Sequence, residues 1–430
     1  MTCTLDVYLH SNLTGHLIQD DYGQTLFEYT PEWLKNPNAI PLSISLPLQE
    51  GKFAEKHCKP FFAGVLPDTA KRKLIARNLG ISANNDFSML EQIGGECAGA
   101  ITFLSTGTKL SDSTGNYRSL SSAELEKILI ELPKRPLMAG ESGVRLSLAG
   151  AQDKIAVYKN DGQLFLPLDN APSSHIIKPD VVEYKGIVFN EAFCMKLAAQ
   201  MGLPVAEVAT EKAGNIDYLF IERYDRISKS ADDKSILARI HQEDFCQALG
   251  IVSERKYQAE GGPSIKDCFD LLRKVSSVPV VDLGRLLDAV IFNFLIGNHD
   301  AHGKNFSFLY RTQDNSGSFG KIRLAPLYDL ICTPVYSNLS KKMAMKIGKT
   351  YELSEVDPRQ FEKLADEIGF TKPLVKRKVI DHAKRMLQQI DKIQIPHPVT
   401  DEIRKFIGDH CSNVLDRFTT DEPKKQAAIQ

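Results

Sequence analysis

A polar segment between two apolar ones carries the side chains with the most obvious chemistry in this sequence. It reads Asn298-His-Asp-Ala-His-Gly-Lys-Asn305, after an apolar run that ends at Gly297 and before the strand-like residues 306–310. Asp300 and Asn305 lie five positions apart, the D-x-x-x-x-N spacing of a catalytic base and a metal ligand in phosphoryl-transfer enzymes. Because Asp and Asn are also common in connecting loops, the neighbouring elements must decide between a site and a loop.

A lysine and a glutamate further upstream can serve the same chemistry. Lys178 ends a predicted strand of residues 174–178, and Glu191 follows Asn190, which we expect to cap a helix that ends at Gly202. Phosphoryl transfer needs cations on the nucleotide phosphates, because catalysis is mostly positioning and charge neutralisation. We therefore expect Lys178 to hold the α- and β-phosphates and Glu191, in the first helical turn, to orient Lys178. Taken singly, Lys178 also fits a solvated surface charge and Glu191 a favourable contact with the helix dipole.

A third carboxylate follows a predicted hairpin. Residues 306–310 and 321–324 read as its two strands, and Asp329 comes shortly after them. The hairpin should bring Asp329 back beside Asn305, where the oxygen atoms of both side chains can bind Mg²⁺. Asp300 would then accept the proton of the substrate hydroxyl and orient that hydroxyl.

A loop of small residues precedes these groups. We predict a short strand at residues 144–147, and strands at 154–158 and 163–168 that are joined by a tight turn. The loop has one glycine and does not match G-x-G-x-x-G, but its position before the lysine strand is that of a nucleotide-covering loop in a protein kinase. Its residues are Leu148, Ala149, Gly150, Ala151, Gln152 and Asp153.

The wider pattern predicts an α+β protein with a two-lobed, protein-kinase-like fold. Its N-terminal lobe is mixed α/β and its C-terminal lobe, from residue 226 onward, is mostly α-helical. We expect an N-terminal α/β subdomain at 1–120, an ATP-binding part at 121–225 and a catalytic lobe at 226–430. The predicted strands are 41–47, 98–104, 204–211 and 216–224, with others in 4–27; the predicted helices are 68–80, 86–93, 121–132, 243–249, 265–275, 282–296 and several after 358.

Composition limits the class of protein. The 430 residues are 43% hydrophobic and 25% charged, with a net charge of -1, so no overall basic field indicates nucleic acid binding. The eight cysteines form no C-x-x-C pair, which argues against a zinc site or a disulfide framework. The first residues lack a signal-peptide pattern, and the most apolar run, 286–297, is too short to span a bilayer. We expect a cytoplasmic protein with reduced thiols and no membrane contact.

One segment is locally basic. It could touch DNA phosphates, with Lys376, Arg377 and Lys378 as the candidate contacts, or it could be a solvated helix face. Its basic residues are Lys372, Lys376, Arg377, Lys378, Lys384 and Arg385.

Several strings closely resemble the HipA toxin kinases. The resemblance runs from about residue 4 to residue 415, and residues 62–68 and 93–99 are similar to the N-terminal region of that family. The strings are Ser147-Leu-Ala-Gly-Ala-Gln-Asp-Lys154, His175-Ile-Ile-Lys178, Glu222-Arg-Tyr-Asp-Arg226, His241-Gln-Glu-Asp-Phe-Cys-Gln247 and Gly297-Asn-His-Asp-Ala-His-Gly-Lys-Asn305.

The resemblance implies a bacterial serine/threonine protein kinase that uses ATP and Mg²⁺ and belongs to a toxin–antitoxin pair. It implies a small helix-turn-helix antitoxin dimer, HipB-like, which binds operator DNA and represses the shared operon with the toxin as corepressor. The substrate class it implies is the aminoacyl-tRNA synthetases, notably the glutamyl enzyme. Modification of that enzyme stalls translation and favours persistence.

By motif position, the resemblance assigns a role to each matching residue. Asp300 is the catalytic residue, with His302 as a further candidate at the position that faces the γ-phosphate in other kinases. Leu330 and Ile331 follow the metal ligand Asp329, so the metal loop departs from D-F-G and argues against a Phe-flip switch. The remaining assignments are Asn305 and Asp329 for metal, Lys178 for the nucleotide, Glu222, Arg223 and Tyr224 for the adenine hinge, and Ser147 for autophosphorylation.

Phosphorylation of Ser147 should switch the kinase off. A phosphate adds a charge of about -1.5 to -2 at the start of the loop that should cover the nucleotide phosphates. Repulsion should drive the loop out of that conformation. Alternatively, the phosphoserine could bind Arg145, Lys178 or the metal-site residues and hold the open state.

Three other functions remain open from the sequence. The Asp/Asn/Asp set also fits a small-molecule kinase of the aminoglycoside-phosphotransferase kind. His299-Asp300 with His302 suggests an HD-type phosphohydrolase, although no second metal-binding cluster is evident. A catalytically inactive corepressor scaffold is the third alternative, and the intact set of candidate catalytic residues argues against it.

Overall fold

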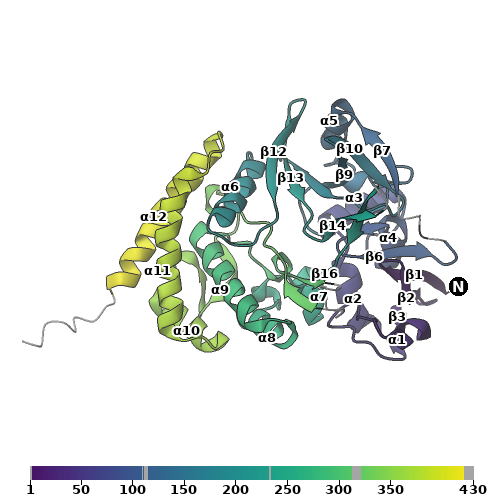
Figure 1. The fold of residues 1–430 in the computed structure, drawn as a ribbon, viewed down its shortest axis with the longest axis horizontal. Coiled ribbons are helices and arrows are strands. Elements are labelled where there is room, and N and C mark those ends of the chain that lie inside the picture. Colours follow the sequence, from purple (N-terminus) through teal and green to yellow (C-terminus); the bar gives the residue numbers. More distant parts are fainter. Residues whose placement is uncertain (1, 109, 111–114, 232–233, 312–320, 421–430) are drawn as a thin grey trace, which may run out of the picture.

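An antiparallel sheet forms the N-terminal end of the molecule in the computed structural model, which describes residues 2–108, 110, 115–231, 234–311 and 321–420 (Figure 1). The alternation of Leu5, Val7 and Leu9 makes the first strand, because all three side chains are buried on one face of the sheet. In sheet order its strands are β4 (Lys52–Phe53), β3 (Thr25–Tyr29), β2 (Asn12–Gln19), β1 (Cys3–Leu9) and β6 (Ile101–Ser105).

Four helices accompany this sheet. The predicted helices at 68–80 and 86–93 are confirmed, and Gly80 ends the first of them in the left-handed conformation with φ 68°. The other two helices, α1 and α2, were not predicted. The four are α1 (Pro31–Lys35), α2 (Glu55–Gly64), α3 (Thr69–Leu79) and α4 (Asp86–Ile93).

The strand predicted at 41–47 is wrong. Leu42 and Leu46 are buried as the alternation suggested, but this segment forms a turn with one isolated bridge between Ser43 and Leu46. The Tyr29 hydroxyl donates to the Leu46 carbonyl at 2.6 Å and accepts from the Leu42 amide at 2.9 Å. A side chain therefore satisfies backbone groups that a neighbouring strand would otherwise have paired.

A six-stranded sheet forms the next layer, with α5 and α6 packed beside it. The capping box of Ser121 and Glu124 is present at the start of α5. In sheet order the strands are β12 (Val208–Ala213), β13 (Ile216–Glu222), β11 (His175–Pro179), β9 (Ile155–Asn160), β10 (Gln163–Leu168) and β7 (Asn116–Leu120); the helices are α5 (Ser122–Glu131) and α6 (Ile187–Gln200).

A short parallel pair joins the N-terminal region to the small-residue loop. The strand predicted at 144–147 is confirmed in its last two residues, β8 (Leu146–Ser147), which pair with β5 (Glu96–Cys97). The small-residue loop therefore begins from a strand that is held against the N-terminal region.

The prediction of helical structure from residue 226 onward is wrong at its start. Two strands form a hairpin there, β14 (Arg226–Ala231) with β15 (Lys234–Arg239). A third strand, β16 (His241–Asp244), then pairs with β17 of the predicted 306–324 hairpin, which is confirmed. The remaining strands are β17 (Ser307–Arg311), β18 (Lys321–Leu324), β19 (Lys342–Ile347) and β20 (Thr350–Glu352).

Helices build the rest of the C-terminal half (Figure 1). The predicted helices at 265–275 and 282–296 are confirmed, the second one starting three residues earlier at Pro279. The α-helices are α7 (Phe245–Leu249), α8 (Ile265–Val275), α9 (Pro279–Ile296), α10 (Pro358–Ile368), α11 (Lys372–Gln389) and α12 (Pro398–Thr420); short 3₁₀ helices are η1 (Pro136–Met138), η2 (Ser253–Arg255), η3 (Gln258–Glu260), η4 (Gly303–Asn305), η5 (Thr333–Val335), η6 (Leu353–Glu355) and η7 (Ile390–Lys392).

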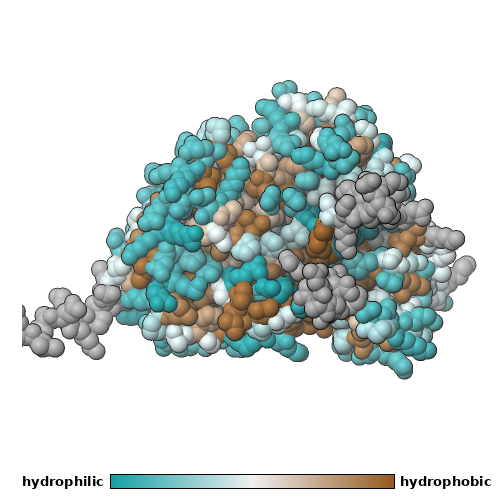
Figure 2. Space-filling model, in the orientation of Figure 1, coloured by the Kyte–Doolittle hydropathy of each residue, from teal (hydrophilic) through white to brown (hydrophobic). Residues whose placement is uncertain are grey.

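The α+β class and the two-lobed arrangement are thus confirmed, with sheets on one side and the bundle α8–α12 on the other (Figure 1). The domain boundaries proposed at 120 and 225 stay predictions. Figure 2 shows a largely hydrophilic surface over α10–α12. Among the described residues, no helix is long and apolar enough to cross a membrane.

Candidate active site

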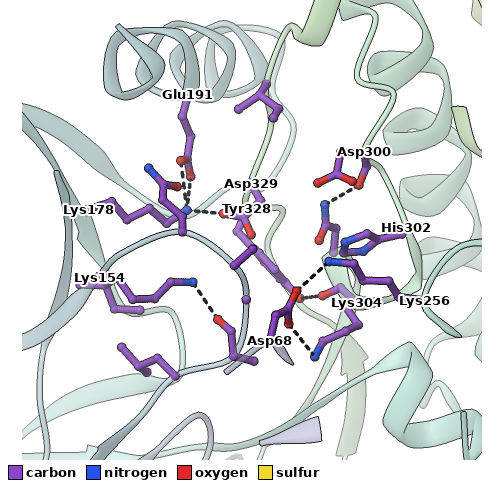
Figure 3. A pocket seen from close by; sticks show the side chains of 18 of the residues that line it. Asp68, Lys154, Lys178, Glu191, Lys256, Asp300, His302, Lys304, Tyr328 and Asp329 are labelled. Atoms are coloured by element: carbon purple, nitrogen blue, oxygen red, sulfur yellow. Dashed lines mark hydrogen bonds and ion pairs between the residues drawn. The ribbon is translucent and has the colours of Figure 1, made fainter. Parts of the chain in front are cut away.

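A cavity of about 1320 Å³ lies between the two lobes, and the predicted site residues line it. Figure 3 shows two groups of side chains in this cavity. Lys178, Glu191 and Asp329 point toward one another, and Asp68, Lys256 and Lys304 form a second group at the candidate catalytic loop, residues 298–305, to which Lys304 belongs. The predicted members that line the cavity are residues 148–153, Lys178, Glu191, Glu222, Arg223, Tyr224, Asp300, His302, Asn305 and Asp329.

Lys178 lies between two carboxylates. Its ammonium donates to both Glu191 oxygens, at 2.8 and 3.0 Å, and to Asp329 Oδ1 in a short contact. Burial acts to lower the pKa of Lys178, but the neighbouring carboxylates of Asp329 and Glu191 outweigh this effect. The pKa of Lys178 is therefore raised above its usual range. The lysine therefore stays protonated and available to phosphate oxygens.

Asp329 is held in an unusual backbone conformation. Its φ is +53°, in the left-handed region that residues other than glycine rarely adopt. Burial acts to raise the pKa of Asp329, but Lys178 and Lys154 outweigh it, so the pKa lies below the usual range and the group is ionised. Such backbone strain is often found where a side chain must be aimed at a ligand.

The prediction that Asn190 caps a helix with Glu191 in its first turn is wrong. The helix α6 begins one turn earlier, after Gly186 in the left-handed conformation, and Asn190 is buried inside it. The Asn190 amide donates to the Cys332 carbonyl at 2.9 Å and accepts from the Cys332 amide at 2.8 Å. It therefore ties α6 to the segment after Asp329, which explains a polar residue in this buried position.

The catalytic-loop candidates are arranged by hydrogen bonds within the loop. Asn298 accepts from the Asp300 amide at 3.1 Å, and the Asn305 side-chain amide donates to the Asp300 carbonyl at 3.0 Å. The Asp300 carboxylate accepts a hydrogen bond from the Tyr257 hydroxyl at 2.7 Å. Because the nitrogen of the Asn305 side chain faces Asp300, its oxygen remains as a possible metal ligand.

His302 is an uncharged member of the site. Burial lowers its pKa to about 4, although Asp300 acts in the opposite direction, so the imidazole is neutral at pH 7. Its ring meets the Tyr257 ring edge to face, with centroids 5.3 Å apart. Its Nδ1 is buried without a hydrogen-bond partner. A neutral His302 can accept or donate a hydrogen bond to a ligand, but it does not supply a cation.

The small-residue loop is fastened at both ends. Gly150 accepts a hydrogen bond from the Asp68 amide at 3.3 Å, and Ala149 accepts one from the Lys154 ammonium at 2.7 Å. Asp153 forms an ion pair with Lys71 at 2.6 Å. Gly150 has φ 106°, a backbone conformation that residues with a side chain rarely adopt, so this position favours glycine.

Ser147 is fully buried. Its hydroxyl donates to the Val65 carbonyl at 3.0 Å, and its backbone belongs to β8. In this conformation the hydroxyl is inaccessible to a phosphate donor. Modification of Ser147 therefore requires β8 to leave its place beside β5.

The predicted hinge residues have different surroundings. Glu222 is exposed, whereas the Arg223 guanidinium is buried and forms ion pairs with Glu96 at 3.0 Å and Asp225 at 2.8 Å. The Tyr224 hydroxyl donates to Gln242 at 2.5 Å. The Arg223 side chain is therefore occupied by this ion-pair network, beside the two other predicted hinge residues.

Other residues of the site were missed in the sequence. Asp68 accepts from Lys256 at 2.9 Å and lies 3.9 Å from the Lys304 nitrogen. Lys304 also donates to Ser253 at 2.9 Å. Lys154 is buried beside Lys178, and burial lowers its pKa to about 8. Asp68, Lys154 and Lys256 come from distant parts of the chain, so no local spacing could have indicated them, whereas Lys304 lies within the polar segment of residues 298–305.

The basic segment lies away from the cavity, on α11. Lys378 forms an ion pair with Asp288 at 2.6 Å, and Lys372 forms one with Asp366 at 3.0 Å. Among the three predicted DNA contacts, Lys376 and Lys378 are half-buried and Arg377 is exposed. Contact with DNA stays a prediction.

Sequence profiles of two domains cover most of this chain. The HipA N-terminal domain matches residues 5–104, and the HipA-like C-terminal domain matches residues 146–393. The chain belongs to the HipA family. Y4mE, a Sinorhizobium fredii protein whose name describes it as a candidate kinase, is 45% identical over 87% of this chain and 88% of its own.

HipA of Shewanella oneidensis is similar to this chain along almost its whole length. The serine/threonine-protein kinase toxin HipA of Shewanella oneidensis is 28% identical over 97% of this chain and 95% of its own. The solved complex of HipA, HipB and operator DNA from Shewanella oneidensis MR-1 matches with a TM-score of 0.80 at 27% identity, covering 97% of each chain. The predicted family, fold and serine/threonine kinase class are therefore confirmed.

Proposed function

We propose that this HipA-family chain is the toxin of a toxin–antitoxin pair and phosphorylates a protein of translation, such as glutamyl-tRNA synthetase, with ATP and Mg²⁺. The observation that carries the kinase chemistry is Lys178 held between Glu191 and Asp329, with Asp300 and Asn305 lining the same cavity. These are a phosphate-binding cation, its orienting acid, a base and two oxygen ligands.

The residues present fit a nucleotide with a divalent cation. Asp329 is ionised, and Asn305 keeps an oxygen free of the Asp300 contact. Both are hard oxygen donors of the kind that Mg²⁺ binds, and the cation would neutralise charge on the transferred phosphoryl group. Nucleotide phosphates would also compete with Asp329 for Lys178, which releases Asp329 to the metal.

Each side chain then has a defined task in transfer. Lys178 binds the α- and β-phosphates, while Glu191 keeps its ammonium aimed into the cavity. Asp300 accepts a hydrogen bond from the substrate hydroxyl and takes its proton as the new O–P bond forms and ADP leaves. The hinge of Glu222 to Tyr224 would border the adenine, and the loop of residues 148–153 would cover the phosphates.

We further propose that Ser147 is an autophosphorylation site that switches the kinase off. Its complete burial supports a switch, since a phosphate cannot occupy the space beside Val65 without displacing β8. The displaced chain takes the small-residue loop away from the phosphates. Active protein and modified protein would therefore differ in the position of residues 146–153.

Partners are proposed from the Shewanella oneidensis complex, which contains HipA, HipB and operator DNA. By similarity this chain would bind a HipB-like helix-turn-helix dimer in the cytoplasm and act with it as corepressor, reaching operator DNA mainly through the antitoxin. The exposed Arg377 on α11 is a candidate phosphate contact in such a complex.

Substitution of Asp300 tests the proposed chemistry. Asp300→Asn should bind ATP as the wild type does and lose phosphoryl transfer, while Asp329→Ala should weaken metal-dependent nucleotide binding. Radiolabelled ATP in a cell lysate, with the labelled species identified by mass spectrometry, separates a protein substrate from a small alcohol. Asp366→Asn, on the surface of α10, is the matched control. Undiminished transfer by Asp300→Asn would falsify the assignment, and absence of label with every variant would indicate an inactive scaffold.

A further inference from the structure

The segment between α7 and α8 connects three parts of the molecule at the catalytic loop. Lys256 binds Asp68 of the N-terminal region at 2.9 Å. The Gln258 side chain accepts from the Lys346 amide of β19 at 2.8 Å. Tyr257, between them, donates its hydroxyl to Asp300 Oδ1 at 2.7 Å. A single short segment therefore reaches the proposed base from one side and the N-terminal region from the other.

The Asp300 backbone and its carboxylate are held by different groups. Contacts from Asn298 and Asn305 to the backbone fix where the residue lies, but they leave rotation about its side-chain bonds open. In the part of the chain that the structure describes, the Tyr257 hydroxyl is the group that hydrogen-bonds to the carboxylate, and it binds Oδ1. Because Tyr257 holds Oδ1, the second carboxylate oxygen of Asp300 points in one fixed direction. A substrate hydroxyl can therefore donate a hydrogen bond to that oxygen without displacing Tyr257.

Tyr257 is itself well placed to act as a fixed donor. Its ring packs edge to face on His302, and the Lys256 ammonium lies 5.4 Å from the ring centroid. Burial and the neighbouring Asp300 both raise its pKa above the usual range, so the phenol keeps its proton. In Figure 3, Lys256 extends beside His302 toward Asp68, so the ion pair lies next to the catalytic loop.

We propose that Tyr257 is a positioning residue that aims the Asp300 carboxylate at the substrate hydroxyl, and that the Asp68–Lys256 ion pair holds Tyr257 in place. This inference rests on the proposed role of Asp300 as the base. A base must come within about 2.6–3.2 Å of the proton it accepts. An error of about 1 Å in such a group can cost about a hundredfold in rate. The N-terminal region thereby contributes to catalysis through Asp68, which lies far from Tyr257 and Asp300 in the sequence.

Tyr257→Phe tests the hydroxyl while it keeps the ring against His302. With the full-length protein and the acceptor protein identified by lysate labelling, kcat should fall about 10- to 100-fold, while the KM for ATP and the melting temperature stay close to wild type. Tyr218→Phe, which removes a hydroxyl that donates to the Glu211 carboxylate at 2.8 Å away from the cavity, should leave kcat unchanged. A purely structural role for Tyr257 would lower the melting temperature without this separation of kcat from KM.

Asp68→Asn tests the second part, because it removes the charge that holds Lys256 and leaves the Asp68 backbone contact to Gly150 intact. We expect kcat to fall several-fold, and the double variant with Tyr257→Phe to be no slower than Tyr257→Phe alone, since both changes act through one hydroxyl. If the double variant instead shows the product of the two single losses in kcat, the proposed role of Asp68 is refuted.

Wild-type or higher kcat in Tyr257→Phe, together with an inactive Asp300→Asn, overturns the positioning role and leaves the proposed function standing. Transfer by Asp300→Asn would instead overturn the proposed function.

Discussion

Replacing Leu146 by alanine should accelerate the phosphorylation of Ser147. Leu146 and Leu148, on either side of the serine, are 1% and 4% exposed, and the serine hydroxyl is bonded to the Val65 carbonyl. Burial of each leucine contributes about 1.5–3 kcal/mol and the hydrogen bond about 1 kcal/mol. Release of β8 should therefore cost about 4–7 kcal/mol, so that roughly one molecule in 10³ to 10⁵ exposes Ser147 at any time.

Leu146→Ala removes about 2 kcal/mol or more from the docked state and should raise the exposed population about 30-fold. If opening precedes transfer, the rate of phosphate addition should rise by the same factor. Intact-mass analysis during incubation with ATP and Mg²⁺ measures that rate. Ser147→Ala should take up no phosphate and remain active toward another substrate, and Ser147→Asp should bind ATP poorly.

Leu17→Ala, a buried leucine of β2, controls for general destabilisation. An unchanged rate in Leu146→Ala, or an equal acceleration in Leu17→Ala, would refute the argument that the docking of β8 limits modification. Phosphate uptake by Ser147→Ala at the wild-type rate would show that another residue is phosphorylated.

Three further predictions concern charge. Glu191→Gln should lower kcat/KM for ATP about tenfold or more, because it removes a charged hydrogen-bond partner of a buried lysine; wild-type kinetics would contradict this. Burial raises the pKa of Glu243 from 4.5 to about 7, because the folded protein favours the protonated carboxyl. The protonated form therefore adds about 3 kcal/mol to the free energy of unfolding below pH 4.5, and this contribution is lost as the pH rises through 7. Urea unfolding should therefore show a flatter pH profile for Glu243→Gln than for the wild type or the exposed Glu402→Gln. Arg377→Ala should reduce the salt slope of operator binding by the antitoxin complex by about one unit, and an unchanged slope would exclude this contact.

Local signals in the sequence determined most individual elements. The capping box at Ser121 and the helix-ending Gly80 predict the helices that the structure contains, because caps satisfy backbone groups within a few residues. The order of Lys178, Asp300, Asn305 and Asp329 also indicated a common site before any geometry was known. Their side chains do line one cavity.

Local signals failed where distant residues satisfy the backbone or a charge. The turn at 41–47 has the alternation of a strand, but Tyr29 binds its backbone groups. Asn190 has the chemistry of a helix cap, but its partner is Cys332, 142 positions away. In both cases a polar side chain hydrogen-bonds to a backbone group that is distant in the sequence and not to a local one. A buried backbone group without a hydrogen bond would lower the stability of the folded protein.

The chain order of chemical groups was therefore readable from the sequence alone, since phosphoryl transfer uses few residue types and a kinase-like fold presents them in a recognisable order. Which groups touch was decided by the tertiary structure. Lys178 pairs with Asp329 across 151 positions, Lys256 with Asp68 across 188, and Tyr257 with Asp300 across 43. Contacts at such separations depend on how the lobes and loops pack, and residue spacing in the sequence does not indicate them. These contacts place Tyr257 and Asp68 in the site, where the sequence pattern had not predicted them.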